Sequence, residues 1–60
     1  MSSIRKGSKG VVSASMQTPR GMIYKGTKIV VEEYVSDDQI RIHDQAGRVL
    51  WVKSSNILMY

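Results

Sequence analysis

Apolar and polar side chains alternate through much of the second half of this chain, and that alternation restricts it to β-structure. Residues 28–35 read Lys-Ile-Val-Val-Glu-Glu-Tyr-Val, and residues 39–43 alternate isoleucine with polar side chains. A two-residue period is typical of a strand with one buried face. No segment shows the period of about 3.6 residues that an amphipathic helix requires. We therefore expect an all-β domain whose core includes Ile29, Val31, Ile40 and Ile42.

Turn signals divide the chain into five predicted strands. Residues 36–38 and 44–47 are rich in turn-forming residues, and Gly47 suits the left-handed position of a tight hairpin. Ser54-Ser55-Asn56 suits a single 3₁₀ turn, because these side chains readily bond their own backbone. Glu33 shares the inward phase of Val31, which predicts either a β-bulge there or a strand that leaves the core near Glu33. The predicted strands are residues 10–16, 28–35, 39–43, 48–52 and 57–60.

The first third of the chain is predicted to contain an arm and a long loop on either side of the first strand. Residues 1–10 are rich in Ser, Gly and Lys and are expected to form a flexible basic arm, with Ile4 tucked against the body. The alternative is that the arm forms part of the first strand. Residues 17–26 contain one proline and two glycines, and we expect a long hairpin-like loop whose apolar residues 22–24 rest on the rim. Residues 11–60 then form one domain.

Size and composition limit how this domain is stabilised. The chain has 60 residues and no cysteine, so neither a disulfide nor thiolate-bound zinc can hold it together. A domain of this size buries only about 60% of its unfolded surface, which makes a homo-oligomer one possible source of stability. No apolar run is long enough for a transmembrane helix, and no apolar signal segment follows the basic start. The expected location is cytoplasmic, without a membrane partner.

Charge is distributed unevenly along the chain. The net charge is +4; residues 1–31 contain no acid, whereas all five acids lie between residues 32 and 44. A basic surface attracts nucleic acid or acidic proteins at long range. The competing interpretation is that these charges only keep a small protein soluble.

Three segments between residues 25 and 58 form a pattern known from one family. Lys25-Gly26-Thr27-Lys28-Ile29-Val30-Val31 follows the long loop, Gln39-Ile40-Arg41-Ile42 follows a turn, and Gly47 precedes Trp51-Val52-Lys53-Ser54-Ser55-Asn56-Ile57-Leu58. In these residues the chain resembles the SH3-like small β-barrel, most closely the bacterial SH3 type. The resemblance implies a five-stranded SH3-like barrel with a long first loop and a short 3₁₀ turn before the last strand.

The binding functions of that family do not follow from the resemblance. Eukaryotic SH3 domains bind proline-rich peptides through an aromatic groove. Here Gln39 stands near the position of its tryptophan, and Lys53 and Asn56 stand where its proline and tyrosine would be. Bacterial SH3 domains mostly serve cell-wall proteins that carry a signal peptide and a catalytic domain, and we expect neither here.

Several side chains suggest a site, and each also has a simpler structural explanation. Trp51 is out of phase with Leu50 and Val52 and could be an exposed recognition aromatic; we expect instead that it packs over the open end of the barrel, under the long loop. His43 beside Asp44 could start an acid–base or metal site, but a solvated strand histidine is the preferred interpretation. We expect no catalytic residues, no metal and no cofactor.

The basic side chains are the main functional indication. We expect a small non-catalytic regulatory or accessory protein that binds nucleic acid through phosphate contacts, with Trp51 or Tyr34 stacking on bases. The alternative is an adaptor or inhibitor of phage or plasmid type, which would bind an acidic protein partner through an exposed strand edge or the long loop. The predicted contact residues are Arg5, Lys6, Lys9, Lys25, Lys28, Arg41 and Arg48.

Overall fold

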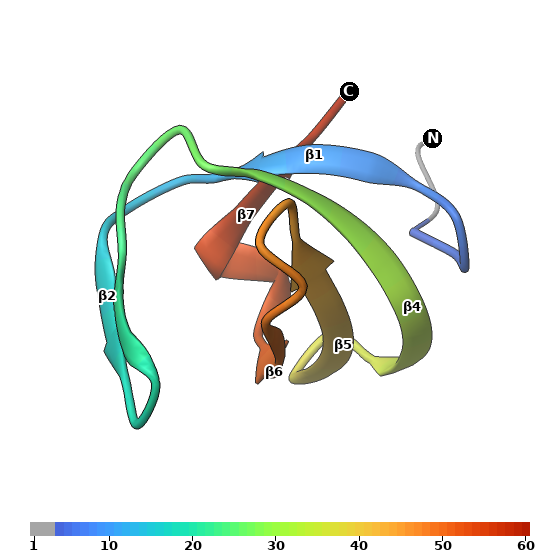
Figure 1. Ribbon diagram of the computed structural model, residues 1–60. Coiled ribbons are helices and arrows are strands. Elements are labelled where there is room, and N and C mark those ends of the chain that lie inside the picture. The colour runs from blue at the N-terminus through green and yellow to red at the C-terminus, as the bar shows by residue number, and fades with distance from the viewer. Residues whose placement is uncertain (1–3) are drawn as a thin grey trace.

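A computed structural model describes residues 4–60 and shows an all-β protein (Figure 1). Within this range one five-stranded antiparallel sheet and one two-stranded ribbon are present. The all-β class and the 3₁₀ turn are confirmed. The elements are β1 (Lys9–Val12), β2 (Met16–Thr18), β3 (Gly21–Ile23), β4 (Lys28–Ser36), β5 (Gln39–Asp44), β6 (Val49–Val52), the 3₁₀ turn η1 (Ser54–Asn56) and β7 (Ile57–Met59).

The large sheet has the order β6-β5-β4-β1-β7, so the last strand returns to pair with the first. That pairing runs from Gly10 opposite Met59 to Val12 opposite Ile57. In the described residues the edge strands β6 and β7 do not pair with each other, and the sheet is therefore not closed into the predicted barrel. The physical reason is that η1, a turn rather than a hydrogen-bonded ladder, joins β6 to β7, while the three residues of β7 pair with β1.

β4 is the longest strand and arches over the body of the protein (Figure 1). Its pairing with β5 shifts register between Val31 and Glu33 and again between Tyr34 and Ser36. The first shift confirms the predicted bulge. Because a bulge changes which side of the strand each later residue faces, Val35 is 53% exposed although it has the same phase as Val31.

The core consists mainly of isoleucine and valine side chains, as the alternation predicts. Ile29, Val31, Ile40 and Ile42 are all buried, which confirms their predicted positions. Ile4 packs against this cluster, as predicted, together with Met16, Leu50 and Met59. In the described part of the chain the buried apolar residues are Val12, Ile23, Ile29, Val31, Ile40, Ile42, Val52 and Ile57.

The first predicted strand is too long, and the predicted loop contains strands of its own. β1 ends at Val12, and residues 13–14 form a bend with Ala14 exposed. The chain leaves the sheet here because Val12 donates to Thr27 and accepts from Gly26, which draws both chain segments into the base of the β2–β3 ribbon. Ile23 of this ribbon belongs to the core, so the ribbon is anchored to the body at its base.

The predicted arm is hydrogen-bonded to the sheet from Gly7 onward. The Gly7 amide donates to the Val31 carbonyl at 2.8 Å, and the Val31 amide donates to the Ser8 carbonyl at 2.8 Å. Lys9 and Gly10 already belong to β1, which agrees with the alternative that the arm forms part of the first strand. Residues 1–3 of the predicted arm lie outside the described residues. Between residues 4 and 60, no helix has the length and apolar character needed to cross a membrane.

Candidate functional site

One row of side chains crosses the outer face of the sheet. Lys9 of β1 lies opposite Val30 of β4, and Val30 lies opposite His43 of β5. The Tyr60 amide donates to the Lys9 carbonyl at 3.0 Å, which places Tyr60 beside β1 on the side away from β4. Residues that lie opposite each other in neighbouring strands direct their side chains to the same face. Tyr60, Lys9, Val30 and His43 therefore share one outward-facing row.

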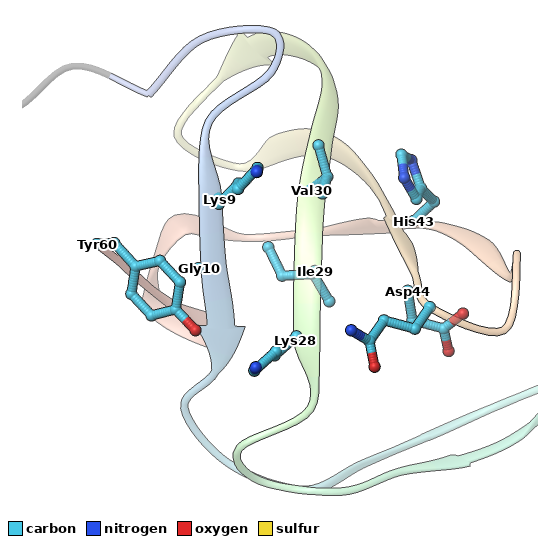
Figure 2. Close-up of a pocket in the computed structure, with 9 residues that line it drawn as sticks. Lys9, Gly10, Lys28, Ile29, Val30, His43, Asp44 and Tyr60 are labelled. Carbon is cyan, nitrogen blue, oxygen red and sulfur yellow. The ribbon is translucent and has the colours of Figure 1, made fainter.

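A groove of about 330 Å³ follows this row (Figure 2). Tyr60 lies at one side of the groove and His43 at the other, and the side chains of Lys9 and Lys28 lie between them (Figure 2). Val30 contributes an apolar part of the lining. The groove thus combines an aromatic ring, two ammonium groups and an imidazole, and Asp44 and Gln45 also contribute to its lining.

The two lysines of the groove lie close together and have no ion-pair partner within residues 4–60. Val11 lies opposite Lys28, so Lys9 and Lys28 are diagonal neighbours across the β1–β4 pair, a backbone separation of about 7–8 Å. Two cations this close together make the groove attractive to an anion with more than one charged group.

Asp44 lines the groove but is held by an ion pair of its own, and two further acids are paired within the β4–β5 hairpin. Glu32 Oε2 lies 2.8 Å from His43 Nδ1, and Glu32 Oε1 lies 3.4 Å from Arg41 Nε. Glu33 Oε1 lies 3.3 Å from Arg41 Nη2. Arg41, one of the predicted phosphate contacts, therefore has two carboxylate partners. Its guanidinium is less available to a phosphate than the ammonium groups of the lysines are.

Arg41 also lies against Trp51, its partner across the β5–β6 pair. The guanidinium carbon is 5.8 Å from the centroid of the indole ring, which is within cation–π range. Trp51 remains 53% exposed. The expectation that it packs under the long loop is wrong, because the loop residues form the separate β2–β3 ribbon and Trp51 belongs to the outward-facing set of β6.

Arg48, another predicted contact, binds an acid that faces the interior. Its Nε donates to Asp44 Oδ2 at 2.7 Å, its amide donates to Asp44 Oδ1 at 2.9 Å, and the Ala46 amide donates to Oδ1 at 3.0 Å. Burial by itself would raise the pKa of Asp44, but these hydrogen bonds and the charge of Arg48 together lower that pKa below its ordinary value. Arg48 precedes β6 and does not share an outer strand face with Arg41.

The remaining predicted contacts are spread over the surface. Arg5 and Lys6 are exposed just before β1, and Lys25 is exposed in the turn before β4. Tyr34 lies near the opposite end of β4 from Lys28 and donates its hydroxyl hydrogen bond to Asp37. That hydrogen bond, together with partial burial and the charge of Asp37, raises the pKa of Tyr34. The acidic neighbour makes Tyr34 a poor position for stacking next to a phosphate chain.

His43 and Asp44 both line the groove, but their side chains do not form a pair. The two side chains leave β5 on opposite faces, His43 toward Glu32 outside and Asp44 toward Arg48 inside. Within residues 4–60 no three side chains of His, Cys, Asp or Glu gather in a way that would hold a metal ion. His43 matters here as one wall of the groove.

Tyr60 was not among the site residues predicted from the sequence. The signal for it was the alternation after η1: Ile57 is buried, Leu58 is exposed, Met59 is partly buried and Tyr60 is 80% exposed. That alternation assigns Tyr60 to the outer face. The position of Tyr60 beside Lys9 depends instead on the pairing of β7 with β1, which the alternation does not reveal.

Comparisons with known proteins leave the function to be inferred from this geometry. No protein-family model, curated protein or solved structure matches the chain. The features available for a functional conclusion are therefore the groove, its two lysines and the aromatic side chains on the same outer face.

Proposed function

We propose that this protein is a small non-catalytic accessory protein that binds nucleic acid on the outer face of its sheet. The observation that supports this function is a pair of lysines, Lys9 and Lys28, that have no ion-pair partner within residues 4–60 and lie in a groove whose walls are Tyr60 and His43. A phosphate chain supplies repeated negative charges, and positively charged protein surfaces bind it largely by displacing its counterions. A nucleic-acid ligand is also consistent with the cytoplasmic location that we expect from the sequence.

Other basic residues extend the attraction around the groove. Lys25 lies in the turn that leads into β4, and Arg5 and Lys6 lie just before β1, so all three are close in sequence to the strands that carry the groove lysines. The acids Glu32, Glu33, Asp37 and Asp38 lie further along β4 and in the turn that follows it. The resulting charge asymmetry would orient a polyanion toward the β1 side of the sheet.

We also propose that the fold is an open form of the SH3-like small barrel. The order of elements supports this assignment: a first strand, a long segment containing the β2–β3 ribbon, three strands joined by tight turns, one 3₁₀ turn and a closing strand beside β1. Sheets in this kind of small domain leave an outer face free for a ligand. The proposed binding function depends on the groove and not on this assignment.

Titration of fluorescently labelled single- and double-stranded oligonucleotides, followed by anisotropy at two salt concentrations, tests the proposed function. We expect binding at low salt to at least one of the two forms, with affinity that falls as salt rises. Each lysine that contacts a phosphate contributes about 0.7–0.9 to the slope of log K against log salt. Lys9→Ala and Lys28→Ala should each reduce the slope by about that amount.

Lys53→Ala is the matched control, because it removes the same charge from an exposed position next to η1. The Ser54 amide, one residue further on, donates to the Asp37 carbonyl at 2.7 Å, so Lys53 lies near the acidic β4–β5 turn and away from Lys28. The Lys53 variant should keep the salt slope of the unmodified protein. Absence of binding to either oligonucleotide at low salt would reject the proposed function.

A protein partner is the second candidate, and the open sheet favours it. The described residues of β6 and β7 each pair on one side only, and each strand carries an exposed apolar residue, Val49 and Leu58. Unpaired strand edges are common sites for the addition of a strand from another chain. Failure to bind nucleic acid, together with stoichiometric recovery of one acidic protein, would favour this function. Concentration-dependent sedimentation would instead indicate a second copy of this chain.

A further inference from the structure

We propose that the groove between Tyr60 and His43 binds single-stranded rather than double-stranded nucleic acid, with Tyr60 stacking on a base and Lys9 and Lys28 binding the adjoining phosphates. This inference rests on the proposed function and adds the form of nucleic acid and the stacking residue. It assigns a role to Tyr60, whose position beside β1 is a consequence of sheet pairing.

The spacing across the sheet provides alternating contacts for a strand of nucleotides. Tyr60, Lys9, Val30 and His43 occupy four neighbouring positions across the outer face. Adjacent strands are about 4.8 Å apart, so the row from Tyr60 to His43 spans about 14 Å, three such spacings. A chain that crosses the β-strands would meet an aromatic ring first, then a cation, then an apolar patch and an imidazole.

Tyr60 is available for stacking because its ring is largely free. The side chain is 80% exposed and lies at the side of the groove next to Lys9 (Figure 2). Bases in a single strand offer open ring faces to such a side chain, and stacking of this kind tolerates any base. In a duplex the bases are already stacked on one another, so an exposed tyrosine on the outer face of a sheet gains no base contact.

The rest of the described structure offers little that would fit a duplex groove at this site. The major groove of DNA accepts an α-helix or a two-stranded β-ribbon. In residues 4–60 the helical structure is the single 3₁₀ turn η1, and the β2–β3 ribbon contributes no residue to the groove lining. If a duplex were the ligand, the ribbon with Arg20 at its tip would be the element to contact it.

Anisotropy titration with a labelled oligothymidylate and with a duplex of equal length tests the inference. We expect the single strand to bind more tightly than the duplex. Tyr60→Ala should weaken single-strand binding by about 5- to 150-fold, the range reported by alanine substitution of stacking side chains, while Tyr60→Phe should retain the affinity. Circular dichroism should show that both variants keep the β-fold, because the ring is exposed.

Two further variants serve as matched controls. Tyr24→Ala removes another exposed tyrosine ring, one that does not line the groove, and should leave single-strand affinity unchanged. Arg20→Ala tests the ribbon and should also leave single-strand affinity unchanged. A duplex that binds as tightly as the single strand, or a Tyr60→Ala protein with unchanged single-strand affinity, would overturn this inference while leaving the proposed function in place. No binding to either form would overturn both.

Discussion

Gly10 of β1 lies so close to Leu58 of β7 that a Cβ atom at Gly10 would be 2.4 Å from the Leu58 carbonyl oxygen. The same Cβ would lie 2.9 Å from the Met59 sulfur. This close approach lets β7 pair with β1, and that pairing brings Tyr60 next to Lys9. Gly10, because it has no side chain, therefore permits the strand pairing that places Tyr60 at one side of the groove.

Gly10→Ala should destabilise the fold. An alanine in place of glycine usually adds about 0.4–1 kcal/mol of stability where the conformation permits it. Here the added methyl group meets a backbone atom of the neighbouring strand, and overpacking of this kind costs about 1–3 kcal/mol. Urea denaturation followed by circular dichroism should show a lower midpoint, and Tyr60-dependent binding should weaken with it. Lys9→Ala, a change at an exposed position in the same strand, should alter the free energy of unfolding by no more than about 0.5 kcal/mol. A Gly10→Ala protein as stable as the original would contradict the steric clash that we expect between the added methyl group and β7.

Asp44→Asn should lower the free energy of unfolding by about 2 kcal/mol, since a charge-assisted hydrogen bond is replaced by an amide facing the Arg48 donor. The Asp44 side chain is only 2% exposed, so water cannot take over the lost contact. A 60-residue domain has a total stability of roughly 3–9 kcal/mol, so the change is a large fraction of it. Thermal and urea unfolding at neutral pH measure the effect. Asp38→Asn removes a charge from an exposed turn and should be nearly neutral; equal effects of both substitutions would reject a special role for Asp44.

Acid should destabilise the protein through the same carboxylate. The pKa of Asp44 in the fold lies below the ordinary value of 3.8 that it has in the unfolded chain. A lowered pKa stabilises the fold fully above the unfolded value, and this contribution disappears as pH falls through the folded value. The urea midpoint should therefore fall steadily as pH drops below about 4. Asp44→Asn should show a shallower acid dependence, and an identical dependence in both proteins would assign the effect to other carboxylates.

Trp51 should behave as an exposed tryptophan, and it is the only tryptophan in the chain. Acrylamide quenching of its fluorescence should change little when the protein is unfolded in urea, because the ring is already accessible to solvent in the fold. Trp51→Ala should cost less than about 1 kcal/mol, the amount expected when an exposed cation–π contact with Arg41 is lost. Strong protection from the quencher in the folded protein would contradict the exposure of Trp51 and support its packing under the first loop.

Local patterns predicted the parts of this fold that depend on neighbouring residues. Alternation identified Ile40 and Ile42 as core, and the phase conflict at Glu33 identified the bulge. The turn before β6 was predicted as well, with Gly47 at a φ of 84°. The limits of β1 were not predicted, because Val12 is held by partners far along the chain that no local pattern reveals.

The candidate site was predicted only in part, because charges alone do not show how they pair. Lys9 and Lys28 were both among the predicted contacts, and the structure brings them together. Arg41 and Arg48 were predicted with them, yet each has a carboxylate partner, one on the outer face and one inside. Arg48 pairs inside because β5 directs His43 and Asp44 to opposite sides. Asp44 therefore faces the interior, and Arg48 binds it there.

Sequence alone was sufficient for the all-β class, the main core residues and the surplus of basic charge, because these follow from side-chain period and composition. Tertiary structure decided that β7 pairs with β1 through the glycine at position 10, that the sheet stays open, and that Tyr60 faces the groove lysines. These features come from contacts between residues about 50 positions apart, such as Gly10 and Met59. Bringing such distant residues together costs conformational entropy, and that cost is offset only once the whole sheet has assembled.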